Sequence, residues 1–402
     1  MSEWKKCPIG EVVTLRQGFA INAKSKHYMS KEETSLPLLR IADMKNGTKE
    51  VFVKEEIPQR FIAHPEDIIY TRTGNVGLVF RNNYGVMHNN CFSVTPNDAD
   101  ELSRDFLYYA LQNKTFFDTA NVLARGAAQP DLPHTSFNSI EFAYPSLFAQ
   151  ERIAYILSRY DSLIENYQKQ IKLLEEAAQR LYKEWFVDLH FPGHENAMIV
   201  DGVPEGWEKK KLCELFSFVR GKSYTSKELS DEGTIMVNLK NIQSFGGYKS
   251  DVEKHFIGTF KEEQTLMKGD LIMGVTDMTQ ERRLVGSVAL IPDFKETATF
   301  SMDLIKLISF KLPNIYLYCA MRYGDVSRQI APLANGVNVL HLKPEAISNI
   351  EMVVASDSII EKFVSYTSKT IENILSLQSQ LRLLTEARDR LLPKLLSGEI
   401  EV

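Results

Sequence analysis

The chain has 402 residues, of which 44% are hydrophobic and 25% are charged, and its net charge is −5. This length exceeds one ordinary domain of about 100 to 200 residues and suits two domains with connecting helices. The composition is typical of globular proteins and argues against disorder, while the small acidic excess argues against tight unassisted binding to DNA phosphates.

The chain repeats one unit twice. Trp4 and Gly18 recur 203 positions later, as Trp207 and Gly221. From residue 105 onward the matching positions are 210 apart, so that Gly126 recurs as Gly336. A repeat on this scale predicts two copies of one supersecondary arrangement. We predict an α+β protein with two α/β domains in tandem, residues 1–150 and 207–355, each followed by a long helix.

A loop near the middle of each domain differs between the copies. The first copy has TRTGNVG at residues 71–77, and the second has the longer GVTDMTQERRLVG at residues 274–286. The growth of the offset from 203 to 210 gives the second copy seven extra residues, which we predict to lie in this loop. A variable loop on a constant frame is a common place for recognition, although a neutral surface insertion would look the same. Arginine can bind guanine bidentately, and Asn or Gln can bind adenine. The candidates for contact with bases are Arg72, Asn75, Arg81, Arg125 and Gln129 in the first domain and Asp277, Gln280, Arg282, Arg283, Asn335 and Asn338 in the second.

A long helix is expected after each domain, over residues 151–190 and 356–397. Ten positions from Ile153 to Trp185, at alternating steps of four and three, are all apolar, and seven of the ten equivalent positions in the second copy are apolar. A 3.5-residue repeat keeps one seam facing a partner helix, so we predict an antiparallel coiled coil within a pseudo-twofold repeat. The predicted seam includes Leu157, Ile164, Tyr167, Ile171, Leu174, Leu181, Ile374, Leu377, Leu381, Leu384 and Leu391.

Residues 191–206 are the predicted linker between the first helix and the second domain. Turn signals at His190-Phe-Pro-Gly193 and Ser397-Gly398 end the two helices. A helix of about 35 residues spans about 50 Å, more than the about 34 Å of one turn of B-DNA. The paired helices would then hold the two domains at a fixed separation. Alternatively, each helix packs back on its own domain.

Sequence motifs of catalysis and of metal binding are missing. There is no G-x-G-x-x-G after a strand, no H-E-x-x-H, no G-x-S-x-G and no Asn/Asp-Pro-Pro-Tyr/Phe of the amino-methyltransferases. Gly221-Lys-Ser223 is similar to the end of a P-loop, but Phe216 stands where that motif needs glycine. The four cysteines are far apart and form no C-x-x-C pair, which argues against a zinc site. We predict a chain without its own catalytic site or metal.

No segment of the chain is typical of export or of a membrane. The first ten residues lack the apolar run of a signal peptide, and no later stretch approaches the about 18 apolar residues of a membrane span. We expect a cytoplasmic protein without a membrane partner.

Several segments resemble the specificity (S) subunit of type I restriction-modification systems, and the resemblance covers essentially the whole chain. Their order, with a helix after each domain, is more specific than any one motif. The segments are Gly126-Ala-Ala-Gln-Pro-Asp-Leu132, Ile140-Glu-Phe-Ala-Tyr-Pro145, Gln150-Glu-Arg-Ile153, Trp185-Phe-Val-Asp188 and Leu391-Leu-Pro-Lys-Leu-Leu-Ser-Gly398.

The resemblance implies a non-catalytic subunit whose two target-recognition domains each recognise one half of a bipartite site in double-stranded DNA. The paired helices would set the spacer length and dock partner subunits. The partners implied are two methyltransferase (M) subunits, which use S-adenosylmethionine, and restriction (R) subunits, which use ATP with Mg. The second half departs from the pattern, since Val339 stands where the first has Gln129. Two alternatives are a stand-alone DNA methyltransferase or nuclease and a coiled-coil adaptor for proteins.

Overall fold

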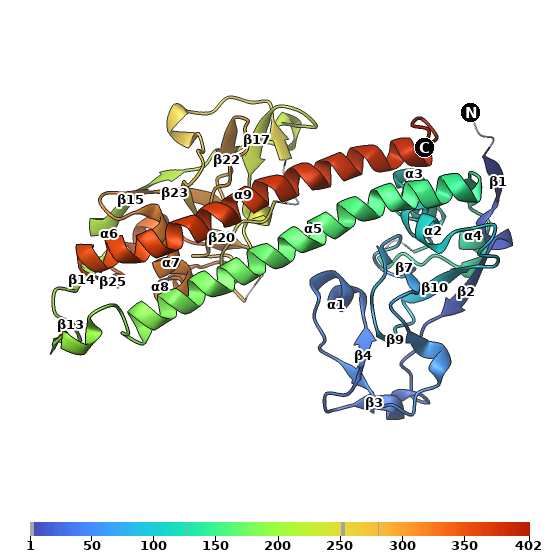
Figure 1. Cartoon of the computed structure of the whole chain (residues 1–402), viewed down its shortest axis with the longest axis horizontal. Coiled ribbons are helices and arrows are strands. Elements are labelled where there is room, and N and C mark those ends of the chain that lie inside the picture. The colour runs from blue at the N-terminus through green and yellow to red at the C-terminus, as the bar shows by residue number, and fades with distance from the viewer. Residues whose placement is uncertain (1–3, 127, 251–253, 280) are drawn as a thin grey trace. The chain divides into compact units, whose positions relative to one another are not determined.

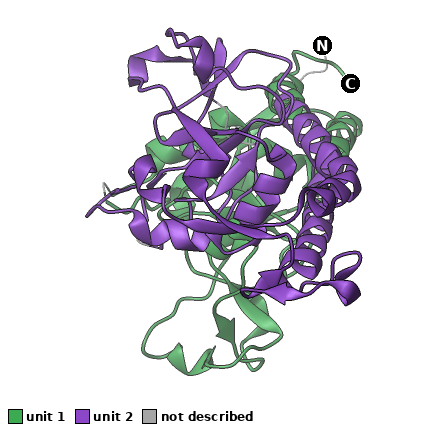
Figure 2. Ribbon diagram, turned by 90° about the vertical axis from the view of Figure 1, so that its left-hand side faces the viewer, with its two compact units in different colours: residues 1–161, 387–402 green, residues 162–386 purple. Residues whose placement is uncertain are grey.

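The computed structural model describes residues 4–126, 128–250, 254–279 and 281–402. The chain forms two compact units, residues 1–161 with 387–402 and residues 162–386 (Figure 2). Each unit combines β-sheets and short helices with part of two long helices, α5 (Leu147–Tyr182) and α9 (Asp357–Leu396) (Figure 1). Two β-rich domains with two long helices confirm the predicted α+β class.

The first unit is built on a four-stranded antiparallel sheet of order β2-β10-β7-β8 and a five-stranded sheet of order β3-β5-β4-β9-β6. β1 pairs with β11, and β4 runs parallel to β9. Its strands are β1 (Lys5–Pro8), β2 (Val13–Gln17), β3 (Met29–Ser30), β4 (Leu36–Leu39), β5 (Phe52–Val53), β6 (Ile62–Ala63), β7 (Ile68–Thr71), β8 (Val79–Phe80), β9 (Gly85–Met87), β10 (Cys91–Pro96) and β11 (Glu141–Tyr144). Its short helices are α1 (Ile41–Asn46), α2 (Arg104–Ala110), α3 (Lys114–Leu123) and α4 (His134–Asn138).

Aromatic side chains fill the core of the first unit. All four residues of β7 are buried, which is typical of a strand covered on both faces. The Tyr70 and Phe92 rings stack at 5.4 Å, and Phe137 of α4 meets Phe92 edge-on at 5.0 Å, geometries that aromatic pairs favour. Leu395 and Leu396 of α9 are buried in this same core. The last residues of the chain therefore complete its first unit.

The second unit has sheets of order β15-β23-β19-β21 and β16-β18-β17-β22, and the pairs β14-β25, β20-β24 and β12-β13. Its strands are β12 (Ile199–Val200), β13 (Val203–Pro204), β14 (Glu208–Lys211), β15 (Phe216–Arg220), β16 (Leu229–Ser230), β17 (Thr234–Val237), β18 (Lys254–Phe256), β19 (Leu271–Gly274), β20 (Thr276–Asp277), β21 (Val288–Leu290), β22 (Ala298–Phe300), β23 (Leu304–Ser309), β24 (Leu340–His341) and β25 (Glu351–Val354). Its short helices are α6 (Leu212–Leu215), α7 (Asn314–Tyr323) and α8 (Val326–Ile330).

Strand pairing confirms the internal repeat. In the first unit β2 pairs with β10 and β10 with β7, just as in the second unit β15 pairs with β23 and β23 with β19. A parallel pair, β4–β9 or β17–β22, occurs in each. Gly18 and Gly221 have the same reason to be glycine, because an added Cβ would lie 2.2 Å from the His88 carbonyl oxygen in one unit and 2.0 Å from that of Ser301 in the other.

The extra residues of the second copy are distributed differently from the prediction, which put all seven in one loop. Strand register places matching residues 203 positions apart at β7 and β19, 209 apart at β8 and β21, and 213 apart at β10 and β23. Relative to the first copy, the second copy thus has six more residues in the long loop and four more between β21 and β23. It then has three fewer residues before α7. The sequence alone shows only the net difference of seven residues, because the strands between the loop and the next matching segment share no motif.

The apolar seam of each long helix is confirmed. All ten predicted seam positions in α5 and its extension, and all ten in α9, are buried or half-buried. In the second unit the rings of Tyr182 and Phe363 meet at 6.0 Å, while in the first Arg388 pairs with Asp161 at 3.1 Å. Contacts between the end of one helix and the start of the other show that the helices run antiparallel within each unit. None of the helices in the described part of the chain has both the length and the hydropathy that crossing a membrane requires.

The alternative packing also occurs, on a second face of α9. The Gln378 Nε2 donates to the Tyr248 carbonyl at 3.3 Å, and Arg382 Nη2 donates to the Phe294 carbonyl at 2.9 Å. The helix therefore packs on α5 along its seam and on the sheets of the second unit through these polar side chains. α5 ends differently, in a π-helical turn over Lys183–Val187, and Leu189 follows with a positive φ of 62°.

Candidate nucleic-acid interface

Two loops meet in the first unit, although about 50 residues separate them in sequence. One follows β7 and the other follows α3. Asp131 forms isolated bridges with both Thr73 and Arg125, and the Gly74 amide donates to the Pro130 carbonyl at 2.8 Å. Gly126 is left-handed with φ of 101°, which lets the second loop turn back at this point. The backbone thus fixes the two loops as one surface.

The second unit pairs the corresponding loops. Thr276 faces His341 in the β20–β24 pair, at the repeat positions of Thr73 and Asp131. Asn335, which matches Arg125, also bridges His341. The scaffold positions agree between the units while the side chains on them differ. The paired loops are therefore a constant frame that presents different polar groups.

The structure gathers most of the predicted base-contacting residues on these loops. Six of them have exposed side chains and lie on the paired loops: Asn75, Arg125, Gln129, Arg283, Asn335 and Asn338. Arg282 is half-buried and has a positive φ of 53°, which turns the loop sharply beside Arg283. Gln280 lies outside the described residues.

Arg72 lies on the first loop pair, but its guanidinium is already engaged. Its Nε and Nη2 donate to the two oxygens of Asp131 at 3.2 and 2.7 Å, and its Nη1 donates to Gln17 at 3.1 Å. Burial raises the pKa of the Asp131 carboxyl, but the hydrogen bonds from Arg72 and Thr73 outweigh this effect and lower it. Arg72 therefore braces the loop pair and has few donors left for a base.

Arg81 and Asp277 also have internal partners. The Arg81 guanidinium lies 4.1 Å from the Tyr108 ring, donates to the Tyr109 hydroxyl at 3.1 Å and pairs with Asp161 at 3.6 Å, so its contacts are on α2 and α5 and not on the loops. Asp277 is 1% exposed and accepts from the Thr279 and Leu284 amides at 2.8 and 2.7 Å. Its carboxylate thus closes the base of the long loop.

Sequence reasoning missed Gln17 and Asp131, which orient Arg72 from both sides. Asp131 stands in the quoted segment Gly126–Leu132, directly after Pro130. A carboxylate in a loop that also carries a candidate arginine was the signal from which an ion pair could have been predicted. Gln17 gave none, because it ends a strand far away in sequence.

The predicted seam residues Leu157, Ile164, Tyr167, Ile171, Leu174, Leu181, Ile374, Leu377, Leu381, Leu384 and Leu391 are all buried or half-buried. In the second unit Leu174 and Leu377 also line a groove of about 500 Å³ between α5 and α9. Two of the polar exceptions in the second seam have partners, since Thr367 donates to the Phe363 carbonyl at 2.8 Å and Arg388 pairs with Asp161.

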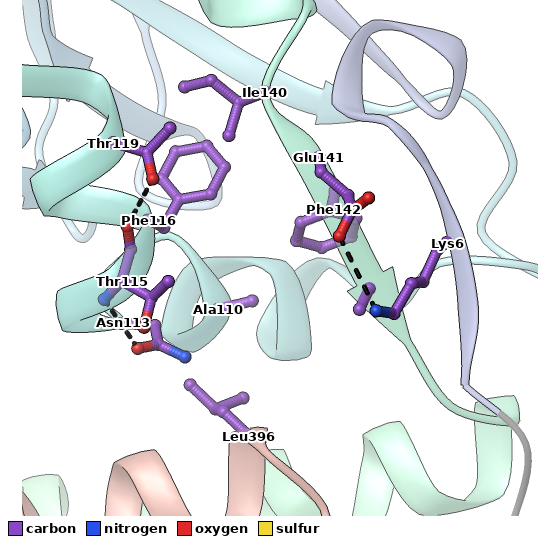
Figure 3. A pocket seen from close by; sticks show the side chains of 11 residues that line it. Lys6, Ala110, Asn113, Thr115, Phe116, Thr119, Ile140, Glu141, Phe142 and Leu396 are labelled. Carbon is purple, nitrogen blue, oxygen red and sulfur yellow. Dashed lines mark hydrogen bonds and ion pairs between the residues drawn. The ribbon is translucent and has the colours of Figure 1, made fainter. Parts of the chain in front are cut away.

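The first unit contains a cavity of about 300 Å³ (Figure 3). Its walls include Phe116 and Phe142, and Lys6 and Glu141 form an exposed ion pair of 3.7 Å at its edge. No histidine or cysteine is among its lining residues. Among the described residues, no three His, Cys, Asp or Glu side chains are grouped as metal ligands.

Residues 1–176 match the family model described as the type I restriction modification DNA specificity domain. The chain is 28% identical over 318 residues to the MjaIX specificity subunit of a type I restriction enzyme from Methanocaldococcus jannaschii, covering 77% of this chain and 72% of that one. It is 22% identical to the HindI specificity subunit from Haemophilus influenzae, covering 100% of both.

A solved structure, the S subunit of a type I restriction-modification system from M. genitalium, has the same fold. The TM-score is 0.61 at 18% identity, over 98% of this chain and 96% of that one. As the sequence predicts, the chain is similar over most of its length to the DNA specificity subunits of type I restriction-modification systems, the non-catalytic components of those enzymes.

Proposed function

We propose that the two loop pairs recognise the two halves of a bipartite target in double-stranded DNA. Residues 1–150 and 207–355 would be the two target-recognition domains. The observation that supports this most directly is the difference between matching positions on one frame, Arg125 in the first unit and Asn335 in the second. Arginine suits guanine and asparagine suits adenine. Two loop pairs with the same backbone arrangement would therefore select different bases.

The helices α5 and α9 would set the number of base pairs between the half-sites and dock the partners. We propose two methyltransferase subunits and restriction subunits as those partners, with S-adenosylmethionine, ATP and Mg bound by them. The net charge of −5 supports such an assembly, because partner subunits would then add phosphate contacts to those of this chain. We further propose that the complex acts in the cytoplasm.

Substitution of one arginine in each unit tests this function. Methylated sites in DNA from cells that carry the system give the target sequence. We expect Arg125→Ala to relax or weaken only the first half-site and Arg283→Ala only the second, by roughly tenfold for each, since one good base contact is worth about 1–3 kcal/mol. Binding of the complex to duplexes with one half-site scrambled measures both effects.

Arg104→Ala is the matched control, because Arg104 is exposed in the first unit but begins α2 and not a loop of the pair. If Arg125→Ala and Arg283→Ala weaken both half-sites equally, these arginines contact phosphates or partners and the assignment of the loops is wrong. A footprint of the complex with two short protected tracts would further exclude a protein adaptor.

A further inference from the structure

A third loop of the second unit, residues 242–248, lies beside the long loop that follows β19. Ile242 and Tyr248 form an antiparallel bridge at its base. The Phe245 amide donates to the Arg283 carbonyl at 3.0 Å, and the Gly247 amide donates to the Val288 carbonyl at 2.8 Å. The loop is therefore joined at two places to the segment that carries Arg282 and Arg283.

The tip of this loop presents an aromatic ring to solvent. The Phe245 side chain is 70% exposed, although burial of a phenylalanine ring is favourable. Its φ is 67°, in the left-handed region that a bulky residue enters only at a cost in conformational energy. Asparagine or glycine would fit this backbone better and would leave no apolar ring in water. Strained backbone that persists is often found at functional sites.

The loop rests on a rigid base. Gly246 and Gly247, with φ of 104° and 105°, pack so closely on Arg322 that an added Cβ would lie 3.0 Å from its Cγ or 2.9 Å from its Nη2. Arg322 in turn holds Glu175 through two hydrogen bonds of 2.8 and 3.0 Å. The position of the Phe245 backbone is thus fixed by buried groups, even though its ring is exposed.

Cationic residues stand close to Phe245 in the chain and in the fold. Lys240 and Lys249 flank the loop, Arg283 is bonded to it through the backbone, and all three are exposed. The described part of the same long loop has two acidic residues, the exposed Glu281 and the buried Asp277. An apolar ring bordered by mostly positive groups suits a duplex, whose apolar bases lie between rows of phosphates.

We propose that Phe245 is a further DNA-contacting residue, whose ring packs against bases of the half-site that the second unit recognises. Proteins use phenylalanine in this way, either against a thymine methyl group or as a wedge at a base step. The inference rests on the proposed function of the second unit. It adds a contact by shape and apolar surface to the polar contacts of Arg283, Asn335 and Asn338.

The test uses the full chain in complex with its methyltransferase partner. Phe245→Asn should lower affinity for the complete target by roughly tenfold, the size of effect expected for one base contact by an aromatic ring. The loss should disappear on a duplex whose second half-site is scrambled, and Phe245→Trp should keep affinity within about threefold of the original. Because asparagine accepts a positive φ, Phe245→Asn should melt at the same temperature as the original chain or higher.

Phe310→Asn is the matched control, since Phe310 is 54% exposed in the same unit and lies outside the three loops. If Phe245→Asn binds the complete target within about twofold of the original chain, the proposal for Phe245 is wrong. In that case Arg283→Ala shows whether the proposed function survives, because its effect on the second half-site does not depend on Phe245. Failure of the unmodified complex to distinguish either half-site would overturn both proposals.

Discussion

The ion pair between Glu175 and Arg322 supports the loop that carries Phe245. The two side chains are 14% and 10% exposed, and Arg322 also carries the glycines behind Phe245. Removal of one partner from a buried pair leaves the other charge without compensation, which typically costs about 3–5 kcal/mol. Glu175→Gln should therefore destabilise the second unit by roughly that amount.

Chemical denaturation followed by circular dichroism measures this effect. Glu165→Gln is the matched control on the same helix, because the Glu165–Lys169 pair is 61% and 70% exposed and an exposed pair contributes about 0–1 kcal/mol. Equal losses in the two variants would show that Arg322 has no special role.

At the scale of elements, the antiparallel seam allows a direct test of the helices as a spacer. The boundary between the units crosses α5 after Asp161 and α9 after Glu386. Seven residues, added at both points, preserve the heptad register and lengthen the helices by about 10 Å, the length of about three base pairs. We expect the spacer in the methylated sites to grow by about that number while both half-sites stay the same.

Insertion of seven residues in α5 alone is the informative comparison. This insertion should shift the apolar seam of α5 out of register with that of α9 and lower the stability of the protein. We expect no single new spacer length in the methylated sites. Altered half-sites with a constant spacer in the double insertion would show that the helices do not set the gap.

The long helices were predictable because a period of 3.5 can be seen in a single sequence. The second face of α9 was not, since Gln378 and Arg382 look like solvated residues until their carbonyl partners are known. The sequence predicted individual candidate residues on the loops of a repeated domain, but not that these loops pair. Their joining through Asp131, and the engagement of Arg72 and Arg81 with internal partners, depend on contacts between distant strands that the sequence does not specify.

At the scale of the whole molecule, acid should weaken the first unit. His88 in the first unit is partly buried, and burial together with the charge of Arg40 lowers its pKa; burial, followed by the charge of Arg72, also lowers the pKa of His134. Both imidazoles therefore bind a proton less readily in the folded unit than in the unfolded chain. The unfolded chain takes up protons below about pH 6.5 that the folded unit does not, so stability present above this pH declines as pH falls below it.

Calorimetry at about pH 7.5 and about pH 5.5 should show the first unit melting at a lower temperature in acid. The amide of Asn90 donates to His88 Nδ1 at 3.3 Å, and an asparagine oxygen can accept this bond without titrating. His88→Asn should thus reduce the shift with pH, whereas His27→Asn, at an exposed position of the same unit, should not. An unchanged shift in His88→Asn would assign the acid response to other groups.

The place of Leu395 and Leu396 in the core of the first unit also bears on how the protein is made. Residues 1–161 leave the ribosome first, but the helix end that completes their core follows only after residues 162–386. At about 5 to 20 residues per second this delay is roughly 10 to 45 s. During translation residues 1–161 must therefore persist with part of their apolar core exposed. A chain truncated before the end of α9 keeps this apolar surface exposed, where chaperones and proteases can bind.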